Sequence, residues 1–319
     1  MNTIGFPIPR KENENRRAIL PNDIATLAHP NHIYIEKGYG KILNIDDNAY
    51  AANGATITTL DEILKKDIIC DPKIGSANYI DCIRDNTVLG WIHAVQGREI
   101  TDKLITNRLT AYAWEDMFEE DGKHTFSRNN ELAGEAAIRH ALDCHPFDHT
   151  PNAAILGRGN TARGAIKMLK EMDIPYQQFT RNDESEFHEN LFKFDIIVCA
   201  ILWDIFRKDH IITRNDLCRL PPNALIIDIA CDKSGAIETS IPTTIDNPCY
   251  VIDGVTHYVV DHTPTLVYKD ATESISKALC PHLDSLIEGK PDKCMQKALI
   301  INHGIIIDQR INRYQTRNN

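Results

Sequence analysis

The sequence predicts a two-domain α/β protein in which one domain is continuous and the other is built from two separated segments. The length of 319 residues gives room for about two hydrophobic cores. Short apolar runs alternate with stretches of helical periodicity, which is typical of a mostly parallel sheet flanked by helices. The alternation breaks once and begins again at Ala153. We therefore assign residues 131–269 to one domain, and residues 1–130 with about 270–319 to the other.

In the first series, apolar runs predict three strands, and apolar residues at helical spacing predict two helices. The strands are Asn31–Glu36, Ile68–Cys70 and Val88–Ile92, and the helices are Asp61–Lys65 and Arg98–Thr106. A longer helical pattern over Asn129–Leu142 is expected to bridge the two domains. Pro146 and Pro151 then punctuate the chain before the second series.

The second series contains five predicted strands and one early helix, followed by two late helices. The strands are Ala153–Leu156, Tyr176–Arg181, Phe194–Ile201, Ala224–Ala230 and Cys249–Ile252. The helices are Thr161–Lys170, Ala271–Leu286 and Asp292–Asn302. Phe194–Ile201 is almost wholly apolar, as expected of a strand buried on both faces. We expect the late helices to return to the first domain, leaving a cleft between the two domains.

Charge and composition exclude several classes of protein. A net charge of -10 argues against a nucleic-acid partner. The longest apolar runs are far short of a membrane span, and no secretory signal is recognisable at the N-terminus. Nine cysteines without a C-x-x-C pair indicate thiols in a reducing compartment. We therefore expect a cytoplasmic protein.

One group of metal-ligand residues is close together in sequence. His140, Cys144, His145 and His149 fall within ten residues of one another. Pro146 disrupts any single helical face that would gather them, and the segment has the character of an interdomain connection. We therefore predict no metal site.

A glycine-rich loop follows the predicted strand Ala153–Leu156. It reads Gly157-Arg158-Gly159-Asn160-Thr161-Ala162-Arg163-Gly164 and opens the next predicted helix. Strand, glycine loop and helix together are the context of a dinucleotide fingerprint, in which the loop backbone and the helix N-terminus hold the pyrophosphate. The third glycine comes later than usual, and Ala162 stands in its place. Residues 131–269 are therefore predicted to be a Rossmann-type dinucleotide-binding domain, and the discontinuous domain is predicted to bind the substrate.

The end of the second strand in this domain bears on the choice of dinucleotide. A NAD site usually offers Asp or Glu there to the ribose hydroxyls, whereas this sequence has Thr180 and Arg181. Arg181 could pair with a 2′-phosphate as a planar fork, with help from Arg158, or it could be a solvated loop arginine. Asp183 and Glu184 follow and could still serve as ribose ligands. We therefore predict NADP (NADPH) in preference to NAD.

Polar residues stand out at four other places in the sequence. Arg16 and its neighbour Arg17 precede a short apolar turn, whereas Lys73, His93 and Asp232 each follow a predicted strand. Loops at the carboxyl ends of parallel strands bind ligands in open α/β sheets. Two cations can hold the carboxylate and carbonyl of an oxo acid, and a histidine can move the proton that accompanies hydride transfer. Each residue also has a purely structural interpretation, so the prediction rests on their combination with the glycine loop.

Several segments together carry a specific likeness to known enzymes. The motifs Arg10–Pro21, Gly38-Tyr39-Gly40, Trp91-Ile92-His93 and Asp228-Ile229-Ala230-Cys231-Asp232 resemble those of alanine dehydrogenases. The glycine loop and the segment Tyr258–Val267 look closer to the N5-(carboxyethyl)ornithine synthases. The chain thus resembles the alanine dehydrogenase and N5-(carboxyethyl)ornithine synthase family, with saccharopine dehydrogenases as more distant relatives. The likeness covers most of the chain.

The resemblance implies a role for individual residues. Arg16 matches the carboxylate-binding arginine, with Arg17 as the alternative, and Lys73 matches the substrate lysine. His93 matches the active-site histidine, and Asp232 matches an aspartate near the nicotinamide. His262 stands where asparagine is expected beside the nicotinamide, which leaves the amine substrate open.

The resemblance also implies a reaction. A 2-oxo acid, with pyruvate favoured, would condense with the side-chain amine of ornithine or lysine, and NADPH would reduce the imine to an N-(carboxyethyl) amino acid. The alternatives are an alanine dehydrogenase that uses ammonia and a non-catalytic NADP-binding regulatory protein. Small-molecule substrates and a homo-oligomer are the expected partners.

Overall fold

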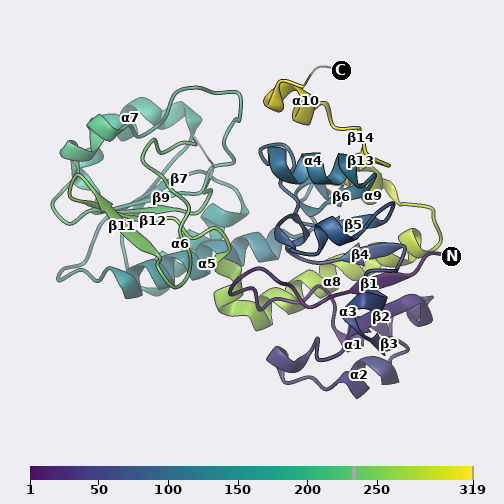
Figure 1. The fold of residues 1–319 in the computed structure, drawn as a ribbon. Coiled ribbons are helices and arrows are strands. Elements are labelled where there is room, and N and C mark those ends of the chain that lie inside the picture. The colour runs from purple at the N-terminus through teal and green to yellow at the C-terminus, as the bar shows by residue number, and fades with distance from the viewer. Residues whose placement is uncertain (232–234, 318–319) are drawn as a thin grey trace. The chain divides into compact units, whose positions relative to one another are not determined.

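The computed structural model describes residues 1–231 and 235–317, which form two compact units (Figure 1). Unit 1 comprises Met1–Ser127 with Tyr268–Asn319, and unit 2 comprises Arg128–Val267. Each unit is built on one mixed, mostly parallel sheet, so the predicted two-domain α/β fold is confirmed. None of the helices in the described part of the chain is both long and apolar enough to cross a membrane.

Unit 1 contains an eight-stranded sheet in the order β14-β13-β6-β5-β4-β1-β2-β3. Its strands are β1 (Ile4–Phe6), β2 (Ile33–Glu36), β3 (Thr56–Thr58), β4 (Ile68–Cys70), β5 (Thr87–Gly90), β6 (Thr110–Ala113), β13 (Leu299–Asn302) and β14 (Ile305–Ile306). The strands from β6 to β3 are parallel, and β13 and β14 add an antiparallel edge.

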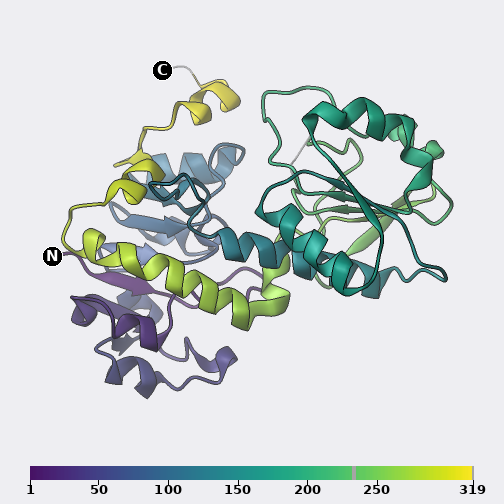
Figure 2. The same cartoon turned by 180° about the vertical axis from the view of Figure 1, so that it is seen from behind.

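Helices cover both faces of this sheet because neighbouring side chains on a strand point to opposite faces. The helices of unit 1 are α1 (Pro21–Ile24), α2 (Asp47–Ala52), α3 (Leu60–Ile63), α4 (Arg98–Thr106), α8 (Tyr268–Ile287), α9 (Lys293–Ala298) and α10 (Gln309–Gln315). Ile68 and Cys70 pack with Ile275 of α8, which lies along this face in both views (Figures 1 and 2). Ile69 points the other way and packs with Leu104 of α4.

Unit 2 contains a six-stranded sheet in the order β11-β12-β10-β9-β7-β8. Its strands are β7 (Ala153–Leu156), β8 (Tyr176–Phe179), β9 (Ile196–Cys199), β10 (Leu225–Asp228), β11 (Cys249–Ile252) and β12 (Val255–Tyr258). All neighbours are parallel except the β11–β12 hairpin. Strand β7 pairs with β8 on one side and β9 on the other, so the chain reverses its winding direction at β7.

Three α-helices pack on the two faces of this second sheet: α5 (Ser127–Cys144), α6 (Asn160–Glu171) and α7 (Glu184–Glu189). Ile155 of β7 packs with Ala137 of α5 and Ala165 of α6. Its neighbour Ala154 faces the other way and packs with Phe187 of α7. Both faces of the central strands are therefore apolar, as the sequence of Phe194–Ile201 predicts.

One predicted helix is wrong over its last four residues. We expected helix throughout Asp292–Asn302, but the helix α9 ends at Ala298 and Leu299–Asn302 forms β13. The run Leu299-Ile300-Ile301 is too short for its periodicity to distinguish helix from strand. Tertiary pairing with β6 decides the outcome, and the register of this pairing shifts between Leu299 and Ile301.

Gly164 explains the unusual spacing of the glycine loop. A Cβ atom at Gly164 would lie 1.9 Å from the backbone oxygen of Glu131 in α5, and one at Gly134 of α5 would lie 2.1 Å from the backbone oxygen of Thr161. The late glycine therefore permits close contact between α5 and α6, whereas Ala162 occupies the usual position of the third glycine and is buried.

We predict that Gly164→Ala destabilises the protein. Alanine within a helix ordinarily stabilises by about 0.5–1 kcal/mol over glycine, but overpacking against a backbone atom costs about 1–3 kcal/mol and should prevail. Urea unfolding measures the difference. Gly159→Ala is the matched control, since its Cβ would meet no described atom within 4 Å. A stabilised Gly164→Ala variant would contradict the proposed helix contact.

Candidate active site

The glycine loop of unit 2 has the geometry of a dinucleotide site. Gly157 has φ +116°, and a Cβ there would lie 2.5 Å from the backbone oxygen of Ala200, so a larger residue would be both strained and obstructed. The Gly157 N–H donates to the Phe179 oxygen at 3.0 Å, and the Gln178 amide donates to the Gly157 oxygen at 2.8 Å. These bonds fix the turn at the carboxyl end of β7.

The next residues leave room for an anion. Gly159 is the N-cap of the twelve-residue helix α6 and has no side chain with which to cap the first turn. Space for a Cβ at Gly159 is open. Uncapped N–H groups and the positive end of the helix dipole favour a phosphate at this position. Asn160 and Thr161 form the first turn of α6 beside this space.

A cavity of about 430 Å³ extends from this loop to the end of β8. After the end of β7 it is lined by Gly157, Arg158 and Gly159, and after the end of β8 it is lined by Thr180 and Arg181. Arg158 and Arg181 are exposed, and neither has a carboxylate within ion-pair distance among residues 1–231 and 235–317. Two arginines outside such ion pairs suit a phosphate-bearing ligand.

The two acids that could have marked a NAD site make other contacts. Both the backbone N–H and the hydroxyl of Thr180 donate to Asp183, at 2.8 and 2.6 Å. Glu184 pairs in bidentate fashion with Arg207, at 2.7 and 2.8 Å. Hydrogen bonds from Arg207 accordingly lower the pKa of Glu184. Both acids are therefore already hydrogen-bonded within unit 2.

His262 lies in a polar setting within unit 2. Its side chain is buried, Nδ1 contacts the carboxylate of Asp261, and the described structure contains no hydrogen-bond partner for Nε2. A buried ring nitrogen of this kind normally has a partner, so Nε2 is available to a bound ligand. The candidate Asp232 lies outside the described residues.

In unit 1, Arg16 is a buried and firmly oriented cation. Its Nε and Nη2 atoms donate to the Glu14 carboxylate at 2.8 and 2.6 Å, and the guanidinium lies 4.9 Å from the centre of the Trp91 ring. Both side chains of the ion pair are almost fully buried. Burial tends to raise the pKa of Glu14, but the charge and hydrogen bonds of Arg16 lower it overall. Glu14 therefore stays ionised and fixes the guanidinium.

Arg17 has a structural role that distinguishes it from Arg16. Its Nε donates to the backbone oxygen of Tyr39 at 2.6 Å, and Nη1 donates to the backbone oxygens of Asn15 and Arg16 at 3.2 and 2.9 Å. Burial lowers its pKa. These bonds hold the backbone at Asn15 and Arg16, so the contacts of Arg17 support the neighbouring Arg16.

Lys73 lies in the same part of unit 1, where its positive charge also acts on Glu14. It is buried and precedes the short 3-10 helix η3 (Ile74–Ser76). Its backbone N–H donates to the Asp71 carboxylate at 2.8 Å, and the Tyr79 hydroxyl donates to the same carboxylate at 2.6 Å. Burial raises the pKa of Asp71 to about 6, against the effect of these hydrogen bonds.

His93 is exposed and has φ 55°, which is uncommon for a residue other than glycine. The carboxylate of Glu115 holds this turn by accepting the backbone N–H groups of His93 and Ile92, at 2.5 and 3.2 Å. Glu115 belongs to the 3-10 helix η5 (Trp114–Asp116). Strained backbone that its surroundings hold in place is common at functional sites.

The structure thus brings Arg16 and Lys73 together around Glu14. The Arg16 guanidinium also lies over the ring of Trp91, and His93 follows Trp91 by two residues in the sequence. Sequence reasoning missed Glu14, Asp71 and Glu115, which orient these residues. Glu14 and Asp71 stand two residues before Arg16 and Lys73, so a search for acids near each candidate cation could have found them. Glu115 carried no such signal, because it lies far from His93 in sequence.

The fold of the two units and the glycine loop of unit 2 are those of a dinucleotide-binding protein. Comparisons with known proteins identify the family to which the chain belongs. The alanine dehydrogenase/PNT N-terminal domain matches residues 5–133, and the C-terminal domain of that family matches residues 134–313. The chain therefore belongs to the alanine dehydrogenase/PNT family. It is an oxidoreductase of the dehydrogenase type, and the family binds a nicotinamide dinucleotide.

Individual relatives cover nearly the whole chain. An N(5)-(carboxyethyl)ornithine synthase of Clostridium botulinum is 31% identical over 301 residues, which span 88% of this chain and 94% of the relative. An alanine dehydrogenase of Mycobacterium tuberculosis is 24% identical over 97% of this chain and 95% of its own length. A solved L-alanine dehydrogenase superimposes with a TM-score of 0.79 at 19% identity, covering 98% of this chain and 99% of that one.

Asp71 leads to a prediction about stability and pH. Between pH 3.8 and about 6 the unfolded chain has lost the Asp71 proton whereas the folded chain retains it. The free energy of unfolding should therefore fall as pH rises through this window, by about 3 kcal/mol relative to Asp71→Asn, and then level off. Urea unfolding of both proteins from pH 4 to pH 7 measures this difference. The exposed variant Asp61→Asn is the control, and a difference that is independent of pH would contradict the prediction.

Proposed function

We propose that the protein catalyses the NADPH-dependent reductive condensation of a 2-oxo acid, pyruvate being favoured, with the side-chain amine of ornithine or lysine. The amine and the carbonyl lose water to form an imine, and reduction of the imine gives an N-(carboxyethyl) amino acid. NADPH, when bound, supplies the hydride. The observation that carries the proposal is the rigid Glu14–Arg16 pair beside Lys73, in a chain that is 31% identical to a carboxyethylornithine synthase.

The residues of unit 1 fit the oxo acid. We assign the Arg16 guanidinium to the carboxylate of the oxo acid. Glu14, which accepts from Nε and Nη2, and the Trp91 ring fix its direction before a substrate arrives. Lys73 supplies a second cation for the carbonyl oxygen. His93 moves the proton that accompanies reduction, because an imidazole can act as both general acid and general base.

The residues of unit 2 support NADPH and the nicotinamide side of the reaction. Gly157, Gly159 and the start of α6 hold the pyrophosphate, while Arg158 and Arg181 pair with the 2′-phosphate. His262 offers its buried Nε2 to the nicotinamide end of the dinucleotide. We assign to Asp232 the role of favouring the cationic iminium, whose carbon accepts hydride more readily. A homo-oligomer and a cytoplasmic location remain predictions.

The second candidate is an alanine dehydrogenase that uses ammonia, which the family model and the 24% identical relative support. A non-catalytic NADP-binding protein is a third, but the polar groups that hold Arg16 and His93 in place favour an enzyme. One experiment separates them: oxidation of NADPH with pyruvate, alone and with ornithine, lysine or ammonia. Our proposal requires dependence on a diamino acid and a secondary-amine product by mass spectrometry. Ammonia-dependent formation of alanine, or no turnover, would overturn it.

The choice of dinucleotide yields a prediction at Arg181. Arg181→Asp should weaken NADPH binding by about ten- to a hundredfold and leave NADH binding nearly unchanged, because a charge-assisted hydrogen bond contributes about 1.5–3 kcal/mol. Fluorescence titration with both dinucleotides measures the ratio. Lys193→Asp makes the same change of charge on the surface of unit 2 and should leave the ratio unaltered. Equal affinities of the parent protein for NADPH and NADH would contradict the assignment.

A further inference from the structure

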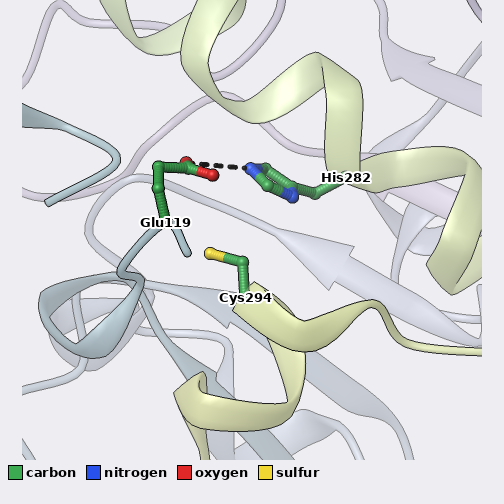
Figure 3. A group of neighbouring side chains, drawn as sticks. All are labelled: Glu119, His282 and Cys294. Atoms are coloured by element: carbon green, nitrogen blue, oxygen red, sulfur yellow. Dashed lines mark ion pairs between the residues drawn. The ribbon is translucent and has the colours of Figure 1, made fainter. Parts of the chain in front are cut away.

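Unit 1 contains a cluster of three metal-ligand side chains that the proposed reaction does not use. Figure 3 shows Glu119, His282 and Cys294 pointing toward a common centre. Their ligand atoms all lie within 4.8 Å of one another, and His282 Nε2 is 3.4 Å from Glu119 Oε1. Glu119 follows η5, His282 belongs to α8 and Cys294 belongs to α9, so three separate segments meet here.

The donor set is selective. An imidazole nitrogen, a thiolate sulfur and a carboxylate oxygen form the combination that zinc accepts in proteins, whereas calcium and magnesium take oxygen ligands. His282 and Cys294 are buried, at 8% and 5% exposure, and Glu119 is partly exposed. Two ligands are therefore anchored in the core of unit 1, and the third faces a route from solvent.

The surroundings orient these ligands as a metal site requires. His282 Nδ1 lies 2.8 Å from Asp292 Oδ2, and the other Asp292 oxygen caps α9 through the Met295 N–H at 2.9 Å. A carboxylate that accepts the Nδ1 proton leaves the Nε2 lone pair directed at the cluster, which is the usual second partner of a metal-bound histidine. The Thr125 hydroxyl donates to Glu119 at 2.7 Å and lies 3.4 Å from Cys294 Sγ.

The site would secure the segment from Met117 to Phe126. Lys297 of α9 already donates to the Phe118 and Glu119 oxygens, at 3.2 Å each. At the other end of the segment, Phe126 stacks on Trp114 at 4.6 Å, and Trp114 contacts Trp91. A metal that ties Glu119 to α8 and α9 would hold this segment to the helices that cover the sheet.

We propose that Glu119, His282 and Cys294 bind one zinc-class divalent cation, with water completing a tetrahedral site. The competing interpretation is a metal-free cluster in which a protonated His282 bridges Glu119 and Asp292. Both interpretations predict that these side chains stabilise unit 1. They differ in whether the thiolate of Cys294 bonds to a metal ion.

Titration of chelator-treated full-length protein with Co²⁺ and Zn²⁺ tests the proposal. One equivalent of Co²⁺ should produce a thiolate-to-cobalt charge-transfer absorption, which Zn²⁺ then removes, and Zn²⁺ should raise the thermal unfolding midpoint. Cys294→Ser should abolish the absorption. Cys280→Ser, which changes another buried cysteine of unit 1, should retain it.

Asp292→Asn provides a second variant that should remain folded, because asparagine is as good an N-cap as aspartate. Its amide would donate to His282 Nδ1 and move the ring proton to Nε2, so metal affinity should fall by about 10–100-fold. The proposal is overturned if Co²⁺ gives no charge-transfer band, if the band survives in Cys294→Ser, or if Zn²⁺ affinity is the same in Asp292→Asn as in the parent.

Discussion

The buried ion pair between Glu14 and Arg16 is the constraint on which the candidate substrate site depends. A charge removed from water is costly unless it is paired and hydrogen-bonded, and removing one partner of a buried pair costs about 3–5 kcal/mol. Here the pairing is bidentate, and the Trp91 ring covers the guanidinium. The pair therefore holds a cation rigidly, at a position where a flexible surface arginine would not suffice.

Other features of unit 1 support this pair. Trp91 packs edge-on against Trp114 at 4.8 Å, and η5, which contains Trp114, also contains the Glu115 carboxylate that holds the turn at His93. Asp71 fixes the backbone at Lys73 in a similar way. Each candidate side chain thus has a carboxylate that orients it or its backbone. Unit 2 differs, because its candidate ligand site depends mainly on the backbone at Gly157, Gly159 and the start of α6.

The sequence predicts the parts of this structure that depend on residues adjacent to one another along the chain. Ala153–Leu156, the glycine loop and α6 are one continuous motif, so their arrangement could be inferred from local pattern. Leu299–Asn302 could not, because only pairing with β6 distinguishes it from a helix. The contact between Glu115 and His93, and the cluster of Glu119, His282 and Cys294, join residues distant in sequence. Local periodicity contains no information about such contacts.

The pyruvate KM of two variants tests the central claim that Arg16 holds the substrate carboxylate. Glu14→Gln retains the Arg16 cation, and Glu14→Gln/Arg16→Gln removes it in the same background without the Glu14 carboxylate. Relative to Glu14→Gln, the double variant should show a KM for pyruvate about ten- to a hundredfold higher, with the Kd for NADPH unchanged. A double variant that binds NADPH normally and retains the pyruvate KM of Glu14→Gln would contradict this account.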